Sequence, residues 1–346
     1  NGKNTELITI AGEPGATPQI ERLMVDGDKW LILGLSISAS FAKEPYKGNM
    51  AIIGEHSASS EITLQDCFIY SALNHDGWTA KQWMEANSGI LMGRNGKNLT
   101  VRNTYVLNTR FGIAMCSPDS LVEGSVVSDY SGDALRMTRD GETVRCNVFK
   151  NAYVSDKDGD PNHDDLVQGF LFNKGTGTIR NFTVKDNILI GNEDPKQPFA
   201  HVPQGIGMFD GPLINFIITG NVIHTAHWHG ISLYDAQGCT INDNVCFTKT
   251  TTGPMPWIMF GSKLKKVGNG NVVKNNYAHT YNLKLAKGAT LENNEPVNED
   301  IYRERLKKLR EQIDIEFGRY HPVAGFARLG TEKGVNQSAP APEKAP

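Results

Sequence analysis

The chain has 346 residues, a length that suits one large domain or two ordinary ones. Its formal net charge of −3 offers no basic field to nucleic acid or to an anionic membrane surface. No apolar run approaches the roughly 20 residues of a membrane-spanning helix, so we expect neither nucleic-acid binding nor membrane insertion.

Short strands are predicted from the beginning of the chain. Residues 8–20, ITIAGEPGATPQI, and residues 28–38, DKWLILGLSIS, combine apolar runs with Gly and Pro turn residues. The first ten residues, NGKNTELITI, show no signal-peptide pattern and therefore leave the compartment open.

A second strand pattern recurs from residue 61 onward, with apolar alternation on both sides of a polar or Gly turn residue. Asn103, Asn187, Asn221 and Asn244 occupy like positions in four of these segments. Asn tolerates turn conformations, and its amide can stack on an equivalent Asn one layer away. The segments are EITLQDCFIY (61–70), NLTVRNTYVL (98–107), SLVEGSVVSD (120–129), ETVRCNVFKN (142–151), NFTVKDNILI (181–190), NFIITGNVIH (215–224) and GCTINDNVCF (238–247).

A third pattern sets the length of the repeat. The segments FGIAMCS (111–117), DALRMTR (133–139), DLVQGFL (165–171), QGIGMFD (204–210) and HGISLYD (229–235) each carry an apolar residue at the third position. These residues are Ile113, Leu135, Val167, Ile206 and Ile231. The first two lie 22 residues apart and the last two 25. About 22 residues with two or three short strands describe one coil of a parallel β-solenoid.

The five cysteines lie within these strand-like runs. Their number is odd, and no Cys-x-x-Cys pair occurs. The pattern indicates buried free thiols and no disulfide framework.

The last predicted element is a helix over residues 298–320, NEDIYRERLKKLREQIDIEFGRY, in which acids lead and bases fill the middle. Its apolar residues near helical spacing are Ile301, Leu306, Leu309, Ile313 and Phe317. We expect this helix to cap the open end of the solenoid, where unpaired strand edges would invite association. A trimerising helix is the alternative, and the Pro- and Ala-rich residues 336–346 are expected to be disordered.

The succession of coils resembles the right-handed parallel β-helix of pectate-lyase-like proteins over about residues 5–290. That superfamily includes polysaccharide lyases, glycoside hydrolases, mannuronan epimerases and phage tailspikes. The resemblance implies an all-β fold. We expect a β-helix domain over residues 1–292, a helical extension over 293–330 and a flexible tail over 331–346.

The resemblance also implies a polysaccharide partner and an extracellular, periplasmic or virion-tail location. A tailspike would be a homotrimer. A Ca²⁺ ion is allowed by the resemblance, since many β-helix lyases use one. The acidic stretch DKDGD (156–160) is not an EF-hand loop, because Pro161 and Val167 stand where that loop needs Gly and Glu.

Two coils exceed the repeat length, and their surplus falls in residues 154–164 and 191–204. Insertions in a solenoid emerge as loops from one edge, so two long neighbouring loops predict the walls of a groove. Neighbouring strands lie about 4.8 Å apart, so aligned polar side chains of successive coils form a ladder on its floor. The catalytic candidates of this ladder are Asp133, Arg136, Asp164, Asp165, Asp210, His229 and Asp235; the substrate-binding candidates are Arg139, His163, Gln168, Gln204, Trp228 and Tyr234.

The stretch HTAHWHG (224–230) places His227 and His229 on one strand face, a geometry that suits zinc. No further Cys or carboxylate ligand stands beside them, so the sequence predicts no metal site and favours His229 as a general acid or base. Trp228, Tyr234, Trp257 and Phe209 are candidate platforms for sugar stacking.

Two classes of function fit these residues. A polysaccharide hydrolase would use two of the acids, with carboxyl groups about 5 Å apart for retention or about 6.5–9.5 Å for inversion. A lyase or epimerase would need a cation such as Arg136 or Arg139 for the uronate and a base such as His229 or a tyrosine. A non-catalytic glycan-binding or structural β-helix, on a virion or a cell surface, is the alternative to both.

Overall fold

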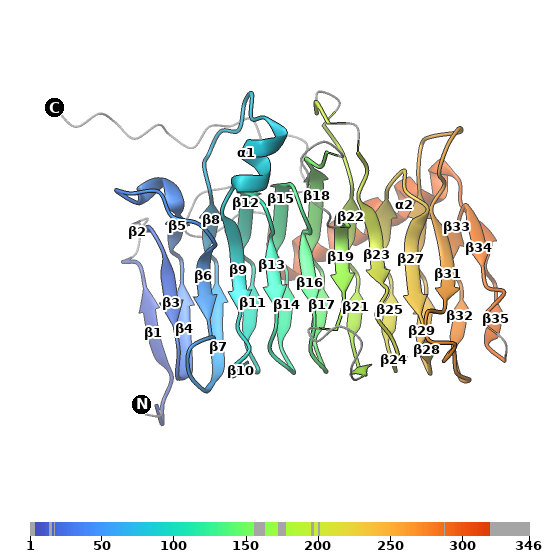
Figure 1. Cartoon of the computed structure of the whole chain (residues 1–346), viewed down its shortest axis with the longest axis horizontal. Helices are drawn as coiled ribbons and strands as arrows, with labels where there is room; N and C mark the ends of the chain where they lie inside the picture. The colour runs from blue at the N-terminus through green and yellow to red at the C-terminus, as the bar shows by residue number, and fades with distance from the viewer. Residues whose placement is uncertain are drawn as a thin grey trace.

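In the computed structural model the chain winds through successive coils of a parallel β-helix (Figure 1). The structure describes residues 4–13, 16, 18–155, 163–171, 178–194, 197–199, 201–286 and 288–318. Three long sheets run along the stack, and we call them sheets A, B and C in the order in which the chain visits them. Every strand pair between neighbouring coils is parallel, which confirms the predicted solenoid.

Sheet A contains β1 (Ile8–Ala11), β4 (Asp28–Leu33), β7 (Ser59–Gln65), β10 (Gly96–Lys97), β11 (Thr100–Arg102), β14 (Leu121–Glu123), β17 (Thr143–Arg145), β21 (Thr183–Lys185), β25 (Ile217–Thr219), β29 (Thr240–Asn242), β32 (Val272–Lys274) and β35 (Thr290–Glu292). Sheet B contains β2 (Gln19–Ile20), β5 (Ser36–Ser38), β8 (Phe68–Tyr70), β12 (Tyr105–Thr109), β15 (Val126–Tyr130), β18 (Val148–Ala152), β22 (Ile188–Ile190), β26 (Val222–His224), β30 (Val245–Phe247), β33 (Tyr277–Ala278) and β36 (Glu295–Pro296).

Sheet C contains β3 (Leu23–Val25), β6 (Asn49–Ile53), β9 (Ser88–Met92), β13 (Ile113–Met115), β16 (Leu135–Met137), β19 (Asp165–Gly169), β23 (Gln204–Met208), β27 (His229–Tyr234), β31 (Trp257–Gly261) and β34 (Thr280–Asn282). A small sheet contains β20 (Ile179–Arg180), β24 (Leu213–Ile214) and β28 (Ala236–Gln237). The helical elements are a 3₁₀ turn (Ala39–Phe41), α1 (Ala80–Glu85) and α2 (Glu299–Phe317).

The apolar third positions of the aligned segments stack in the interior of the solenoid, as predicted. Sheet C pairs Ile113 with Leu135, Leu135 with Val167, Val167 with Ile206, and Ile206 with Ile231. All five side chains are buried and belong to one continuous core. Since side chains alternate along a strand, the residue after each of them faces outward. The same register therefore decides which residues share the outer surface of sheet C.

A ladder of buried asparagines fills the turns between sheets A and B. The Nδ2 group of Asn187 donates to Asn221 Oδ1 at 2.9 Å, and that of Asn221 donates to Asn244 Oδ1 at 2.9 Å. Backbone amides join in, because Asn187 N also donates to Asn221 Oδ1, at 3.0 Å. The whole ladder consists of Asn147, Asn187, Asn221, Asn244, Asn276 and Asn294. The predicted stacking of side-chain amides is therefore confirmed for Asn187, Asn221 and Asn244.

Asn103 is not part of the ladder, so that prediction was wrong. Its backbone has a φ of 45°, in the left-handed region, and its side chain donates to Asp66 Oδ1 at 2.6 Å. Thr104 occupies the ladder position, and its hydroxyl accepts a hydrogen bond from Cys67 N. Each turn holds two successive polar residues, and the sequence does not reveal which of them enters the interior.

Helix α2 lies along the outer face of sheet B and does not cover the end of the stack (Figure 1). The ring of Tyr302 stacks on Phe247 of β30 at 4.5 Å between centroids. At the other end of the helix, Phe317 packs against Gly124, in the turn before β15, a much earlier strand of sheet B. The predicted cap is therefore corrected to a lateral strap. The physical reason is that β15, β18, β22, β26 and β30 present apolar side chains outward, and an amphipathic helix buries more of this strip than of an end.

Ion pairs fix the polar side of this contact. Glu193 accepts from Lys150 at 2.5 Å and from Arg310 of the helix at 3.0 Å. Arg145 of β17 pairs with Glu316 near the helix C-terminus at 2.7 Å. Asn298 caps the start of the helix, since its side chain accepts a hydrogen bond from Ile301 N.

Candidate functional site

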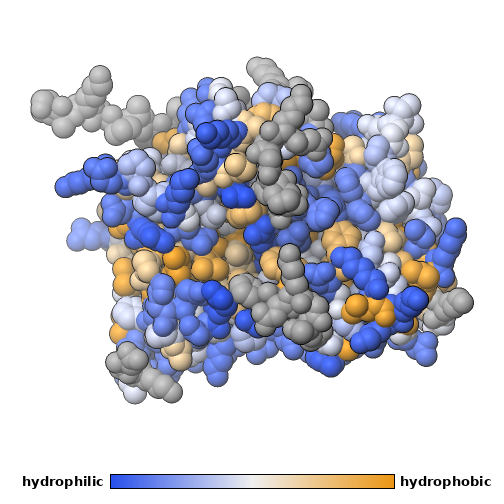
Figure 2. Space-filling view, in the orientation of Figure 1, coloured by the Kyte–Doolittle hydropathy of each residue, from blue (hydrophilic) through white to orange (hydrophobic). Residues whose placement is uncertain are grey.

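Strands β16, β19, β23, β27 and β31 of sheet C form the floor of the candidate site. Their outward residues in one aligned row are Arg136, Gln168, Gly207, Ser232 and Met259. This surface lies on the side of the stack away from α2, where Figure 2 shows hydrophilic and hydrophobic surface intermixed. Of the two long loops, residues 156–162, 195, 196 and 200 lie outside the described residues, and so does the DKDGD stretch.

Two carboxyl groups meet where β16 and β19 begin. The Oδ1 atom of Asp133 accepts a hydrogen bond from Asp165 N at 2.9 Å, so the two residues are direct neighbours across the sheet. Arg136 donates to Asp133 Oδ2 at 2.5 Å, and Gln168 donates to Asp165 Oδ2 at 3.1 Å. Arg136 and Gln168 therefore each bind the acid that precedes them by three positions.

Burial controls the charge of this pair. Asp165 is fully buried, and burial, followed by the charges of Asp133 and Asp164, raises the pKa of its carboxyl well above the usual range. Its Oδ1 atom has no hydrogen-bond partner among the described residues. Tyr130 lies beneath the acids, and burial together with the same carboxylates raises the pKa of its phenol. Burial therefore favours the protonated form of Asp165, which is the form that a general acid needs.

Gly207 leaves room for this carboxyl on the outer side of the sheet. A Cβ at Gly207 would collide with Asp165 Oδ1 and with the ring of Phe209. The carboxyl group thus lies over the next strand, beside an aromatic ring that is itself half-buried. Gln204 continues the row at the start of β23, where it pairs with Asp165, and its Oε1 has no hydrogen-bond partner among the described residues.

His229 stands at the start of the next strand, β27, and two neighbouring side chains fix the orientation of its ring. Its Nδ1 lies 2.6 Å from Ser232 Oγ and 3.3 Å from the indole nitrogen of Trp257. Because an indole N–H can only donate, Nδ1 accepts, and a neutral ring then carries its proton on Nε2. Burial, followed by the charge of His163, lowers the pKa of His229, which favours this neutral form.

Aromatic rings and cations line the surface above the floor. Phe209 lies 5.1 Å from the ring of His229 and 5.2 Å from that of Tyr234. The ammonium group of Lys263 lies 5.7 Å from the Tyr234 ring centre and pairs with Asp210 at 3.5 Å. At the other end, the guanidinium of Arg136 stacks 3.6 Å from the ring centre of Phe111. Rings flanked by charged groups of both signs provide the apolar and polar contacts that a sugar needs.

Most of the predicted residues come together here, with some exceptions. Asp235 is fully buried, and its carboxylate accepts from Ser262 Oγ and from the backbone N–H groups of Lys263, Leu264 and Lys266. It anchors a loop and does not face the groove. Arg139 lies beyond the far end of its strand, where it donates to Cys116 O at 3.4 Å.

The remaining candidates lie at the rim. His163 is exposed, with its ring 6.4 Å from Phe209, and Asp164 is buried next to it. Trp228 has 52% of its surface exposed and lies 5.5 Å from the ring of Trp257. His163 and Trp228 therefore lie at the surface beside aromatic rings at sheet C.

The sequence did not point to Lys263 or Phe111 as members of the site. Lys263 follows β31 directly, and Phe111 stands at the aligned position two residues before Ile113. The place of Phe111 in the site could therefore have been predicted from the alignment of the strand segments.

The described residues contain no group of three or more His, Cys, Asp or Glu side chains arranged to hold a metal ion. The zinc geometry considered for His227 and His229 therefore gains no third ligand within the described part of the chain. Among the same residues, no helix has the length and apolar character that crossing a membrane requires.

The chain has a parallel β-helix fold, and several solved β-helix proteins resemble it in the path of the chain. A solved glycoside hydrolase overlaps 75% of this chain at 10% identity with a TM-score of 0.48, and the Dettilon tailspike protein overlaps 82% at 12% identity with a TM-score of 0.41. The chain spans 53% and 60% of the lengths of those two proteins. PfbA, a surface adhesin of Streptococcus pneumoniae, overlaps 84% at 12% identity with a TM-score of 0.47, over 84% of its own length.

These similarities concern the path of the chain and carry no argument about its activity. No family model matches the sequence, and no curated protein is significantly similar to it.

Proposed function

We propose that the protein binds a polysaccharide along the outer face of sheet C and hydrolyses it there. The observation that supports this most directly is the buried carboxyl pair of Asp133 and Asp165, placed on neighbouring strands beneath a row of aromatic and charged side chains. Groups on neighbouring strands are about 5 Å apart, which is the separation of a retaining hydrolase.

In this proposal Asp165 acts as the general acid. Its proton passes to the oxygen of the glycosidic bond that breaks, and the leaving sugar departs as an alcohol. Asp133, paired with Arg136, is the carboxylate that faces the developing positive charge at the sugar carbon. Water then forms the new bond to that carbon, and its proton returns to Asp165. His229 presents an N–H donor two strands away, where it can orient a neighbouring sugar unit.

Hydrolysis is preferred over elimination because of this carboxyl pair. A lyase would need an accessible base close to the cation that holds a uronate, and His229 lies three strands from Arg136. A set of neutral and acidic polysaccharides, read for both reducing ends and ultraviolet absorbance, separates the two reactions. We expect new reducing ends without an unsaturated, absorbing product.

The Asp165→Asn variant tests the assignment of the acid. We expect it to lose at least about 100-fold in turnover, the contribution of a general acid, while it still binds the polymer. The Asp76→Asn variant changes an exposed acid in another part of the chain and serves as the control. Full activity of Asp165→Asn would contradict the proposed role.

A non-catalytic glycan-binding protein is the second candidate, and one observation favours it. Asp133, Asp164 and Asp165 are all less than 9% exposed, so their carboxyl groups lie below the surface in this conformation. Binding of a polysaccharide by the wild type without any turnover would support this candidate over the hydrolase.

Either function fits an extracellular, periplasmic or virion-tail location, where polysaccharides are met. A tailspike role adds the expectation of a homotrimer. Light scattering on the purified protein measures this directly, since a monomeric mass of 38.0 kDa would argue against a spike.

A further inference from the structure

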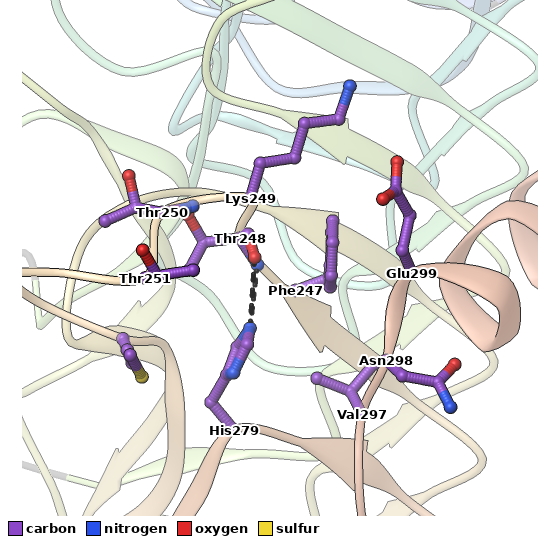
Figure 3. Close-up of a pocket in the computed structure, with 10 residues that line it drawn as sticks. Phe247, Thr248, Lys249, Thr250, Thr251, His279, Val297, Asn298 and Glu299 are labelled. Carbon is purple, nitrogen blue, oxygen red and sulfur yellow. Dashed lines mark hydrogen bonds between the residues drawn. The ribbon is translucent and has the colours of Figure 1, made fainter.

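A pocket of about 360 Å³ lies between sheet B, the connection that follows β30 and the start of α2 (Figure 3). Its origin is a difference between neighbouring coils. The connection from β30 to β31 spans residues 248–256, whereas the next coil connects β33 to β34 through His279 alone. The long connection therefore stands above the short one, and the helix start closes the hollow from the side.

The lining combines an apolar back with a polar rim. Its residues are Phe247, Thr248, Lys249, Thr250, Thr251, Met255, His279, Val297, Asn298 and Glu299. Figure 3 shows the two threonines 250 and 251 on one side of the hollow and Glu299 on the other. The volume falls within the range of about 300–1,000 Å³ of small-molecule sites.

The aromatic part of the lining is rigid. The rings of Phe247 and His279 stack at 5.7 Å between centroids, and His279 Nε2 lies 3.2 Å from both the N–H and the C=O of Thr248. Burial lowers the pKa of His279, so the ring is neutral at neutral pH. The back of the pocket therefore presents fixed, uncharged rings.

The charges at the rim balance each other. Lys249 and Glu299 are both exposed and extend along the upper edge of the pocket in Figure 3. The lining residues themselves offer donors and acceptors without a net formal charge, namely one ammonium, one carboxylate, an amide and threonine hydroxyl groups. The Glu299 carboxylate also accepts from Arg303, which lies outside the lining, at 2.6 Å. This chemistry matches a polar, uncharged ring that carries hydroxyl groups and one apolar face.

The chain itself links the pocket to the outer face of sheet C. The same connection, residues 248–256, ends at Trp257, whose indole lies 5.4 Å from the ring of His229. Trp257 N also donates to Trp228 O at 2.8 Å. A chain of sugars bound at Trp228 and Trp257 would reach this connection first when it leaves the groove.

We propose that this pocket binds one neutral hexopyranose unit of the polysaccharide, as an accessory site outside the catalytic groove. The proposal rests on the polysaccharide function proposed above. An accessory site raises affinity for a long chain by making the second contact intramolecular, without any change in the chemical step.

The test uses the full chain with methyl-labelled methionine, because Met255 lies in the pocket lining. Glucose, galactose and mannose are titrated one at a time, with glucuronate as a charged comparison. We expect a saturable shift of the Met255 methyl signal with at least one neutral hexose and a smaller response to glucuronate. The signal is assigned by Met255→Leu.

Paired variants connect the shift to the pocket. Thr250→Val combined with Thr251→Val removes two hydroxyl groups and keeps the shape, whereas Thr252→Val is the control outside the lining. We expect the double variant to lose the shift and to raise KM for the polymer by about 3- to 10-fold with kcat unchanged. KM for short oligosaccharides should not move.

Each other result overturns a defined part of this account. No saturable shift with any neutral hexose, or an equal effect of Thr252→Val, would end the accessory-site proposal alone. A stronger response to glucuronate would overturn the argument from balanced charge. A Met255 shift in a protein that degrades none of the polysaccharides would retain the pocket and remove the proposed hydrolysis.

Discussion

Two polar ladders run along the same solenoid, and they differ in how their hydrogen bonds are satisfied. In the asparagine ladder between sheets A and B, each amide of the central steps donates to a backbone oxygen and to the next asparagine. In the ladder at the start of the sheet C strands, Asp165 Oδ1 and Gln204 Oε1 have no partner within the described residues. Both sets of side chains are buried to a similar degree.

The difference indicates what each ladder is for. Buried amides that are fully hydrogen-bonded stabilise the stack and specify its register. Buried carboxyl groups that repel each other reduce stability, and such groups are retained where their unusual protonation is useful. The asparagine ladder is therefore structural, and we infer that the carboxyl ladder lies at the proposed site.

The largest expected effect follows from breaking the asparagine ladder. Asn221→Ala would leave Asn187 N and Val184 O without their partners inside the stack. At about 1–3 kcal/mol for each buried unsatisfied group, we expect a loss of about 3–5 kcal/mol in the free energy of unfolding. Urea denaturation measures it, with the exposed Asn192→Ala as control. A loss below about 1 kcal/mol would contradict the structural role.

A smaller effect on the free energy of unfolding is expected when the pH is lowered, because of His227 near the carboxyl ladder. Burial, followed by the charges of His229, His201 and His163, lowers the pKa of His227 to about 4. A lowered histidine pKa gives stability that is present above about pH 6.5 and lost as the pH falls toward 4. Since the side chain is partly solvated, we expect His227→Asn to recover about 2 kcal/mol of that loss at pH 4, measured as thermal stability against pH.

The exposed His56→Asn variant is the control for this measurement. If thermal stability changes with pH in the same way in the wild type and in His227→Asn, protonation of His227 does not control the loss of stability in acid.

Asp165→Asn should have the opposite sign to Asn221→Ala. A raised carboxyl pKa gives stability that is complete below about pH 4 and lost as the pH rises through the folded-state value. The amide cannot ionise, so we expect the variant to be more stable by about 1 kcal/mol at pH 8 and to lose this slope. Denaturation at several pH values tests it, and a destabilised variant at pH 8 would mean that the carboxylate itself is needed for folding.

The smallest effect is expected at Asn103, which the structure places outside the ladder. Asn103→Gly retains the left-handed backbone without steric cost and loses only the bond to Asp66. We expect a change within about 0.5 kcal/mol in the free energy of unfolding. A loss as large as that of Asn221→Ala would instead show that both positions stabilise the stack equally.

The fold could be predicted from the sequence because each coil of a solenoid repeats the same arrangement of short strands and turns. The apolar third positions from Ile113 to Ile231 predicted the register of sheet C residue by residue. The errors came where local pattern is ambiguous or where partners are remote. Asn103 and Thr104 are both polar, and only the turn geometry decides which side chain is buried.

The site was predicted less completely. Asp133, Arg136, Asp165 and Gln168 were found because they share one register, and the structure joins them by hydrogen bonds. Asp235 shares that register too, yet it binds a loop that follows β31, a contact that no alignment of coils contains. The burial that raises the pKa of Asp165 depends on the whole surrounding fold and has no signal in a single segment.

The lateral position of α2 has a mechanical consequence. A solenoid whose coils contact only their neighbours can peel from one end, coil after coil. Here the helix connects Phe247 of a late coil with Gly124 of a much earlier one, so the late coils cannot unravel until it detaches. Under a stretching force applied between Gly124 and the far end of the stack, this part of the protein should therefore resist until one rupture event and only then lengthen in small steps.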